Sequence, residues 1–223
     1  MKGKPQIFFD RILKEGVCFI GTRQTGKTNA LVAMMNSIDV PYIAFDTIGV
    51  IARALKRGWQ PVNPKTQKIF TPPRNPASIR ASFDKVCNDV LLKKNMLLII
   101  DEIAACEYQQ VKVRGVMKSV EVPYFCSKQW LHPLLSQIQN LEGNNNIAVW
   151  FTSQRVAQVH NSLLAACKYH FIFGLYLPSD VAWYAEVIGK SDALRASNLK
   201  PYEFLFKKIG GSCDLMEKFD KMY

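Results

Sequence analysis

One short loop constrains the fold of this chain more than any other part of its sequence. Residues 21–28 read Gly-Thr-Arg-Gln-Thr-Gly-Lys-Thr and match the pattern G-x-x-x-x-G-K-[ST] at every position. The β-rich run 17–20 precedes this loop, and apolar residues recur at helical spacing after it. Between a strand and a helix, such a loop points successive backbone N–H groups and the helix N-terminus at phosphate oxygens. The sequence therefore predicts a P-loop that binds a nucleoside triphosphate.

The side chains of this loop have distinct expected roles. Lys27 is expected to reach the β- and γ-phosphates, and the Thr28 hydroxyl to bind the accompanying Mg²⁺. ATP and Mg²⁺ are therefore the expected cofactors. The predicted nucleotide-binding residues are Gly21, Thr22, Arg23, Gln24, Thr25, Gly26, Lys27 and Thr28.

Apolar strands alternate with helical segments along most of the chain, which predicts an α/β fold with a mainly parallel sheet and helices on both faces. The expected strands are residues 17–20, 42–45, 68–70, 96–100, 147–151 and 170–175. The expected helices are residues 28–38, 78–92, 131–141 and 156–167. A chain of 223 residues fits one domain, here with a core over residues 16–188 and a C-terminal extension over 189–223.

An acidic pair follows the apolar strand 96–100. Asp101 is expected to hold the Mg²⁺ coordination shell, and Glu102 to polarise a water for attack on the γ-phosphate. Asp46 ends another strand of the same kind. An acidic pair can also be a solvated strand end, but beside a P-loop it favours hydrolysis. The adjacent Asp-Glu pair separates hydrolysis from other P-loop chemistries, since a kinase needs a phosphoryl acceptor site and a GTPase needs an N-K-x-D guanine-reading motif, which the sequence lacks.

Gln154 follows the strand 147–151, within the run Thr152-Ser153-Gln154-Arg155. Ligands of open α/β sheets bind beyond the carboxyl ends of the strands, so Gln154 is expected to meet the γ-phosphate and the attacking water. The alternative is an ordinary surface turn after a strand.

The chain is strongly basic, with 29 Lys and Arg against 18 Asp and Glu and a net charge of +11. This excess favours a polyanionic partner, nucleic acid first and an anionic membrane surface second, against the alternative of a merely basic protein. Between the acidic pair and the next helix, basic residues alternate with aromatic ones. The candidate DNA contacts are Lys112, Arg114, Lys118 and Lys128. The alternative is a basic face packed over the sheet.

The six cysteines include no C-x-x-C pair and no zinc-ligand spacing, which favours a reducing compartment. Residues 1–11 lack the apolar segment of a signal peptide, and the longest apolar run, 96–100, is too short to span a bilayer. We therefore expect a cytoplasmic protein with no transmembrane segment.

Three motifs in this order, at residues 21–28, 99–102 and 151–155, resemble the FtsK–HerA superfamily of DNA-pumping ATPases. The resemblance covers residues 16–188, and the strand-terminal Gln154 with its flanks is its most specific part. It implies a RecA-like core that works as a homo-oligomeric ring, usually a hexamer, with double-stranded DNA in the central channel. In that ring Lys27, Glu102 and Gln154 are the expected catalytic residues.

A core of this size without further domains is similar to the genome-packaging ATPases of membrane-containing icosahedral viruses, including archaeal ones. This implies a DNA-packaging motor in the host cytoplasm or on the virion, with a capsid or membrane-vertex protein as partner. The alternatives are a plasmid, conjugative or DNA-repair ATPase, a nucleotide-dependent switch or assembly factor, and a small-molecule kinase.

The chain departs from the superfamily at one point. Many relatives place an arginine just before the strand that carries the glutamine, where it acts across the subunit interface. Here residues 141–145 read Leu-Glu-Gly-Asn-Asn and contain no arginine. The candidates for this role are, in order, Arg155, Arg114 and Arg80; each is otherwise a solvated surface arginine.

Overall fold

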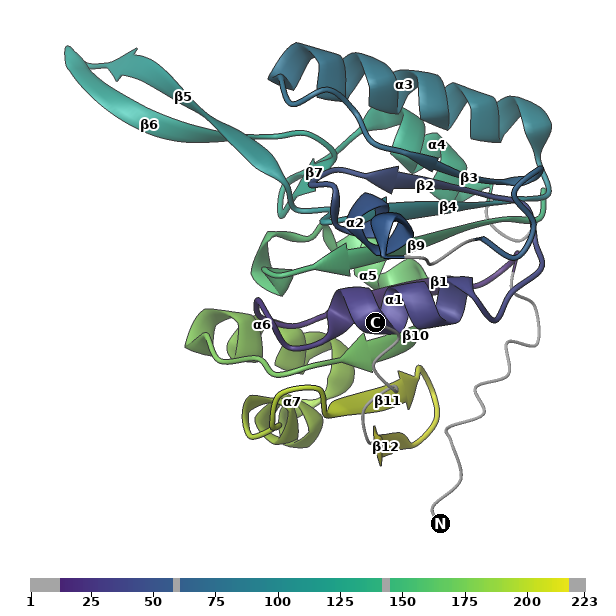
Figure 1. Cartoon of the computed structure of the whole chain (residues 1–223). Coiled ribbons are helices and arrows are strands. Elements are labelled where there is room, and N and C mark those ends of the chain that lie inside the picture. The colour runs from purple at the N-terminus through teal and green to yellow at the C-terminus, as the bar shows by residue number, and fades with distance from the viewer. Residues whose placement is uncertain (1–12, 58–60, 142–144, 217–223) are drawn as a thin grey trace.

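The computed structural model describes residues 13–57, 61–141 and 145–216. Eight strands form its main sheet in the order β12-β11-β10-β1-β9-β4-β2-β3 (Figure 1). The six strands from β10 to β3 pair in parallel, and β11 and β12 pair antiparallel at one edge. Their bounds are β1 Gly16–Ile20, β2 Tyr42–Asp46, β3 Gln67–Phe70, β4 Met96–Asp101, β9 Ile147–Ser153, β10 Cys167–Ile172, β11 Phe204–Lys208 and β12 Cys213–Met216. The predicted α/β fold with a mainly parallel sheet is confirmed.

The central strands are apolar along their whole length because both of their faces are covered. Every residue of β1, β2, β4 and β9 is buried. Successive side chains point to opposite faces, so Phe19 joins one core cluster while its neighbours Cys18 and Ile20 join the other. A strand buried on both faces therefore appears in the sequence as a continuous apolar run.

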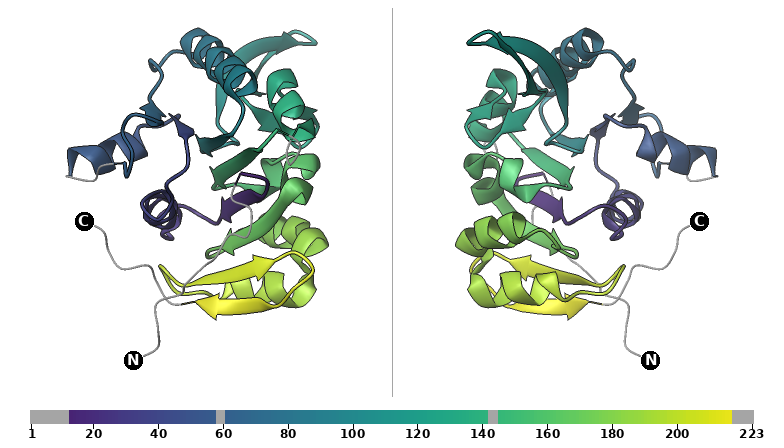
Figure 2. Two further views of the ribbon diagram at one scale, coloured as in Figure 1. Left: turned by 90° about the vertical axis from the view of Figure 1, so that its right-hand side faces the viewer. Right: turned by 90° about the vertical axis from the view of Figure 1, so that its left-hand side faces the viewer.

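Helices cover both faces of the sheet (Figure 2). One face packs against α1 Lys27–Met35 and α2 Val50–Lys56. The other packs against α3 Pro76–Lys93, α4 Pro133–Asn140, α5 Asn161–Ala166, α6 Pro178–Ile188 and α7 Lys190–Ser197. Within the described residues, no helix has the length and hydrophobicity that crossing a bilayer requires.

A β-hairpin leaves the body of the protein beside the ends of the parallel strands (Figure 1). It consists of β5 Cys106–Val113 and β6 Val116–Pro123, which pair antiparallel. Arg114 and Gly115 join them with φ values of 50° and 82°, as a two-residue type I′ hairpin turn requires. A second, short pair, β7 Cys126–Ser127 and β8 Trp130–Leu131, follows it. The sequence predicts no element for residues 108–130, so both pairs are new features.

The predicted helix over residues 156–167 is wrong as a single element. The structure has a short 3₁₀-helix, η1 Val156–Gln158, and then α5, with Val159 extended between them. The Ala157 N–H donates to the Asp180 carboxylate (2.9 Å), and the His160 side chain accepts from the Ser162 N–H (3.3 Å). The Asp180 carboxylate therefore satisfies an N–H group in the first turn of η1, which no helix would pair. The Ser162 N–H bonds to His160 where a continuous helix would pair it with the Gln158 carbonyl, so α5 starts as a separate helix.

The predicted strand 170–175 is shifted. β10 begins at Cys167 and ends at Ile172. Beyond it, the Gly174 carbonyl accepts from the Thr22 N–H (2.9 Å), so residues after β10 support the P-loop backbone instead of continuing the sheet.

Other predicted bounds change less. The expected helix 131–141 begins at Pro133 because Leu131 pairs within β8, and the expected helix 28–38 ends at Met35. From the expected C-terminal extension, β11 and β12 widen the main sheet. Two predictions fall on residues outside the described ranges: that residues 1–11 form no signal peptide, and that residues 142–144 lack the arginine found in many relatives.

Candidate nucleotide-binding site

A cavity of about 330 Å³ opens where the carboxyl ends of β1, β2, β4 and β9 meet. The P-loop forms its floor, as expected for a ligand site in an open α/β sheet. Its lining residues are Arg23, Gln24, Gly26, Lys27, Thr28, Asn29, Ile48, Val50, Arg53, Asp101, Glu102, Thr152, Gln154 and Tyr202. The structure thus brings Lys27, Thr28, Asp101, Glu102 and Gln154 together in one cavity.

The P-loop requires its glycines. Gly21 and Gly26 have φ values of 152° and 108°, which side chains rarely adopt, and a Cβ on Gly21 would lie 2.7 Å from the Phe173 Cβ. Lys27 lies across the loop, where its Nζ donates to the Thr22 carbonyl (2.6 Å). The Thr25 hydroxyl donates to the same carbonyl (2.8 Å). The lysine is therefore held directly over the cradle that would receive the phosphates.

Burial lowers the pKa of Lys27. Removal from water lowers the pKa of its ammonium to about 8, against the opposing attraction of Glu102 and Asp101. A bound triphosphate adds negative charge beside this group and would favour its charged form, so phosphate binding and protonation of Lys27 support each other.

Asp101 has the features of a cation ligand. Its Oδ1 accepts from the Thr152 hydroxyl (3.0 Å), while its Oδ2 is buried with no hydrogen-bond partner among the described residues. Asp46 lies opposite Asp101 on β2, and its Oδ1 is also buried with no hydrogen-bond partner among the described residues. Burial, then the charges of Asp46 and Glu102, raise the pKa of Asp101 to about 7. Carboxylate and hydroxyl oxygens are ligands that Mg²⁺ prefers, so Asp101 and Thr28 fit this ion.

Glu102 has an unusual backbone that other groups hold in place. Its φ is 58°, in the left-handed region. Its N–H donates to the Thr152 hydroxyl (2.8 Å), and its Oε1 accepts from the Gln154 N–H (3.1 Å). Burial raises the pKa of its carboxyl group, partly offset by the Gln154 N–H and by Lys27. A fixed carboxylate of raised pKa is suited to accept a proton from water.

Thr152 lies in the motif at residues 151–155, but the sequence assigns it no role in the site. Its hydroxyl accepts from Glu102 and donates to Asp101, so one side chain fixes both acidic residues. The reason is the sheet order, which places β9 between β1 and β4. The one signal of this role in the sequence is that Thr152 is a polar residue near the end of an otherwise apolar strand.

We expect Thr152→Val to damage the site although valine has nearly the same volume as threonine. The substitution leaves the Glu102 N–H and the Asp101 Oδ1 unpaired, which costs about 2–4 kcal/mol of unfolding free energy. We also expect nucleotide turnover to fall about 10²-fold because the carboxylates lose their alignment. Thr152→Ser keeps the hydroxyl and is the matched control. Equal turnover and equal stability of the two variants would contradict the assignment.

The three predicted arginines lie outside the cavity lining. Arg155 Nε lies 3.5 Å from Asp180 Oδ2, and Arg80 Nη2 lies 2.6 Å from Glu107 Oε1. Arg114 lies in the hairpin turn. Arg23 and Arg53 line the cavity instead. Arg53 was not predicted, because the sequence does not show that the start of α2 borders the P-loop.

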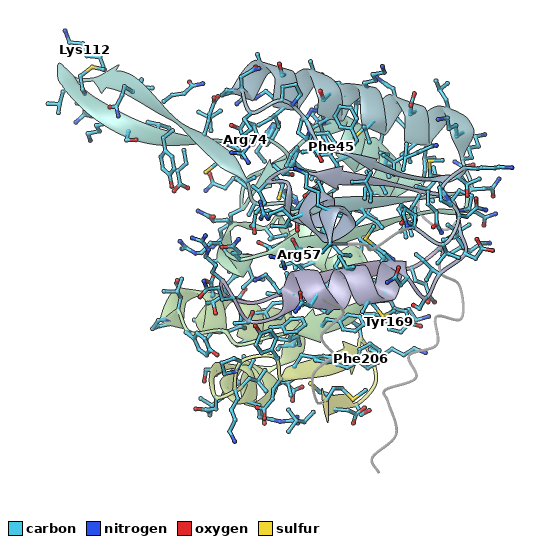
Figure 3. The ribbon with its side chains drawn as sticks, in the orientation of Figure 1. Phe45, Arg57, Arg74, Lys112, Tyr169 and Phe206 are labelled. Carbon is cyan, nitrogen blue, oxygen red and sulfur yellow. The ribbon has the colours of Figure 1, made fainter. Side chains whose placement is uncertain are left out.

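The predicted DNA contacts divide into two places. Lys112, Arg114 and Lys118 lie in the distal half of the hairpin, and Figure 3 shows Lys112 at its far end, away from the body. Lys128 lies in the turn between β7 and β8, with its Nζ 3.7 Å from the centre of the Trp183 ring. Lys128 is therefore separate from the other three.

Several solved structures share this fold. The genome-packaging NTPase B204 of Sulfolobus turreted icosahedral virus 2, in complex with ATP-γS, is 15% identical over 93% of this chain and 98% of that one, with a TM-score of 0.68. The DNA-packaging ATPase B204 of Sulfolobus turreted icosahedral virus is 18% identical over 92% and 98%, also with a TM-score of 0.68.

A third match is EssC (ATPases 2 and 3) from Geobacillus thermodenitrificans, which is 13% identical over 91% of this chain and 39% of that one, with a TM-score of 0.52. No protein-family model and no curated protein sequence matches the chain. The chain therefore shares the fold of these ATPases, and the α/β P-loop core that its motifs predict is confirmed.

Proposed function

We propose that this chain is an ATP-hydrolysing motor that moves double-stranded DNA, with the packaging of a viral genome into a capsid as its task. One observation carries the proposal: the P-loop, the acidic pair and Gln154 meet in a single cavity. The fold shared with the two B204 proteins supports the packaging role.

The residues divide the chemistry between them. The P-loop N–H groups and Lys27 bind the phosphates, and Asp101 and Thr28 hold Mg²⁺, which neutralises charge on the phosphate oxygens when bound. Glu102 orients a water for in-line attack on the γ-phosphate and accepts its proton. Gln154 contacts the γ-phosphate. Because its backbone N–H also holds Glu102, loss of that phosphate is communicated to the water-activating carboxylate.

The motor works as a homo-oligomeric ring, most simply a hexamer, in which a neighbour supplies an arginine to the cavity. Arg155, Arg114 and Arg80 are the candidates. To act in trans, Arg155 would have to release Asp180, and Arg80 would have to release Glu107. Arg114 instead extends from the body on the hairpin. A capsid or membrane-vertex protein anchors the ring in the host cytoplasm or on the virion.

The hairpin supplies the contact with DNA. Its distal half carries Lys112, Arg114 and Lys118 and no acidic residue. Its two glutamates lie nearer the body, where Glu107 pairs with Arg80 and Glu121 accepts from Gln158 (2.9 Å). Cations at an exposed tip neutralise backbone phosphates without reading base sequence, as a translocating motor requires. Lys128 is a secondary contact near the base.

ATP hydrolysis measured with and without duplex DNA, over a range of protein concentrations, tests the proposal. We expect turnover per protomer to rise with DNA and to rise with concentration as the ring assembles. Slow hydrolysis that duplex DNA fails to stimulate at any concentration would contradict a DNA motor and favour a nucleotide-dependent switch.

We expect Lys112→Glu/Lys118→Glu to abolish the stimulation by DNA and leave DNA-free hydrolysis unchanged. Removing two phosphate contacts should reduce the slope of log K against log salt concentration by about 1.8. The matched control, Lys65→Glu/Lys85→Glu, makes the same charge change at exposed positions off the hairpin. Equal loss of DNA affinity in both pairs would show a general charge effect and refute the hairpin contact.

A further inference from the structure

The nucleotide cavity has a second end, away from its acidic residues. The P-loop follows β1, with β9 and β4 on one side of that strand and β10 and β11 on the other. Asp101, Glu102 and Gln154 belong to the first side. Tyr202 lines the cavity and closely precedes β11, so it belongs to the second side.

Tyr202 is fixed against the P-loop by its backbone. Its N–H donates to the Thr25 carbonyl (3.1 Å), and its φ is 72°, a value uncommon for a tyrosine. The turn around it is closed by two further bonds, from the Lys200 N–H to the Glu203 carboxylate (2.9 Å) and from the Glu203 N–H to the Lys200 carbonyl (3.1 Å). The position of the ring is therefore set by the same loop that would hold the phosphates.

The ring itself packs on the P-loop and remains partly open. A Cβ at Gly26 would lie 3.0 Å from Tyr202 Cδ1, so the glycine makes room for the aromatic ring. Tyr202 is still 37% exposed. Tyr202 thus combines an unusual backbone conformation with an aromatic ring that lines a ligand cavity. Residues in unusual backbone conformations cluster at sites that bind ligands, so this combination points to a role in binding.

The phosphates determine where the rest of a nucleotide lies. With the γ-phosphate beside Glu102 and Lys27, the other end of the nucleotide extends away from the acidic residues, and Tyr202 is an aromatic side chain that lines the cavity on the β10–β11 side. We propose that Tyr202 is the platform on which the nucleobase stacks, which extends the proposed function to recognition of the nucleoside. Every base has a π-face, so stacking on an aromatic ring favours a nucleotide over a bare polyphosphate.

The test compares ATP with inorganic triphosphate, because only ATP has a base. Dissociation constants of both are measured with Mg²⁺ for the full chain and for Tyr202→Asn and Tyr202→Phe. Asparagine tolerates the left-handed backbone and removes the ring, whereas phenylalanine keeps the ring. We expect Tyr202→Asn to weaken ATP binding about tenfold and leave triphosphate binding unchanged, and Tyr202→Phe to retain both.

Three other outcomes are informative. Equal weakening of ATP and triphosphate by Tyr202→Asn would overturn the proposal, since it would show that Tyr202 only supports the P-loop. Unchanged ATP affinity would also overturn it. If the unsubstituted chain binds neither ligand, the proposed function itself fails and the platform with it. Thermal unfolding of the variants verifies that each binding result comes from a folded protein.

Discussion

Replacing Glu102 with glutamine is expected to leave ATP binding close to that of the unsubstituted chain and to lower hydrolysis by about 10²–10⁴-fold. An amide of the same shape can still accept the hydrogen bond from the Gln154 N–H, so the site keeps its geometry. It cannot accept the proton of the attacking water. Single-turnover hydrolysis together with equilibrium ATP binding separates these two effects.

The matched control for this substitution is Glu186→Gln, which makes the same chemical change on α6, outside the cavity lining. It should hydrolyse ATP normally. Turnover of Glu102→Gln within a few-fold of the unsubstituted chain would rule out Glu102 as the general base.

Asp101→Asn is expected to make the protein more stable while removing its Mg²⁺-dependent nucleotide binding. The pKa of Asp101 rises from an ordinary 3.8 to about 7 in the folded state, so the folded protein holds this proton more tightly than the unfolded chain does. Stability therefore falls as pH rises from about 4 to about 7, and the full penalty is present above pH 7. At 1.36 kcal/mol for each pKa unit, this rise of about three units means that asparagine should recover about 4 kcal/mol of unfolding free energy there.

Urea unfolding at pH values from 4 to 8, without nucleotide or Mg²⁺, measures this effect. The gain from Asp101→Asn should be near zero at pH 4 and should reach its maximum above pH 7. The exposed Asp39, replaced in the same way, is the control and should give no pH-dependent gain. A gain that does not change with pH would show that the Asp101 carboxyl is not the titrating group.

The sequence predicts the centre of this fold well because local patterns determine it. β1, β2, β4 and β9 are buried on both faces, so each is a short apolar run, and the P-loop motif fixes the loop and the helix after β1. The acidic pair and Gln154 are then located as strand ends. The hairpin has no such signal. Most of β6 is exposed on both faces, so polar and apolar residues do not alternate along it.

The order of strands in the sheet cannot be read from the sequence. Thr152 lies 50 residues from Glu102 and contacts it only because β9 inserts between β1 and β4. Tyr202 reaches the P-loop for a similar reason, since β11 adds to the β10 edge. Likewise, the Ala157 N–H in the first turn of η1 donates to Asp180, which the fold brings to it from 23 residues away.

The hairpin begins only four residues after Glu102, and the connection between them is rigid. Ile103 and Ala104 are buried, the Ile103 N–H donates to the Thr152 carbonyl (2.9 Å), and the Tyr124 N–H donates to the Ala105 carbonyl (3.0 Å). Strands of eight residues extend about 26 Å, so a rotation of about 7° at the base moves the tip by about 3 Å. That displacement is close to the rise of one DNA base pair, about 3.4 Å. The hairpin therefore has the dimensions of a lever arm for the proposed motor, in which a small angular change next to Glu102 would move the tip by about one base pair.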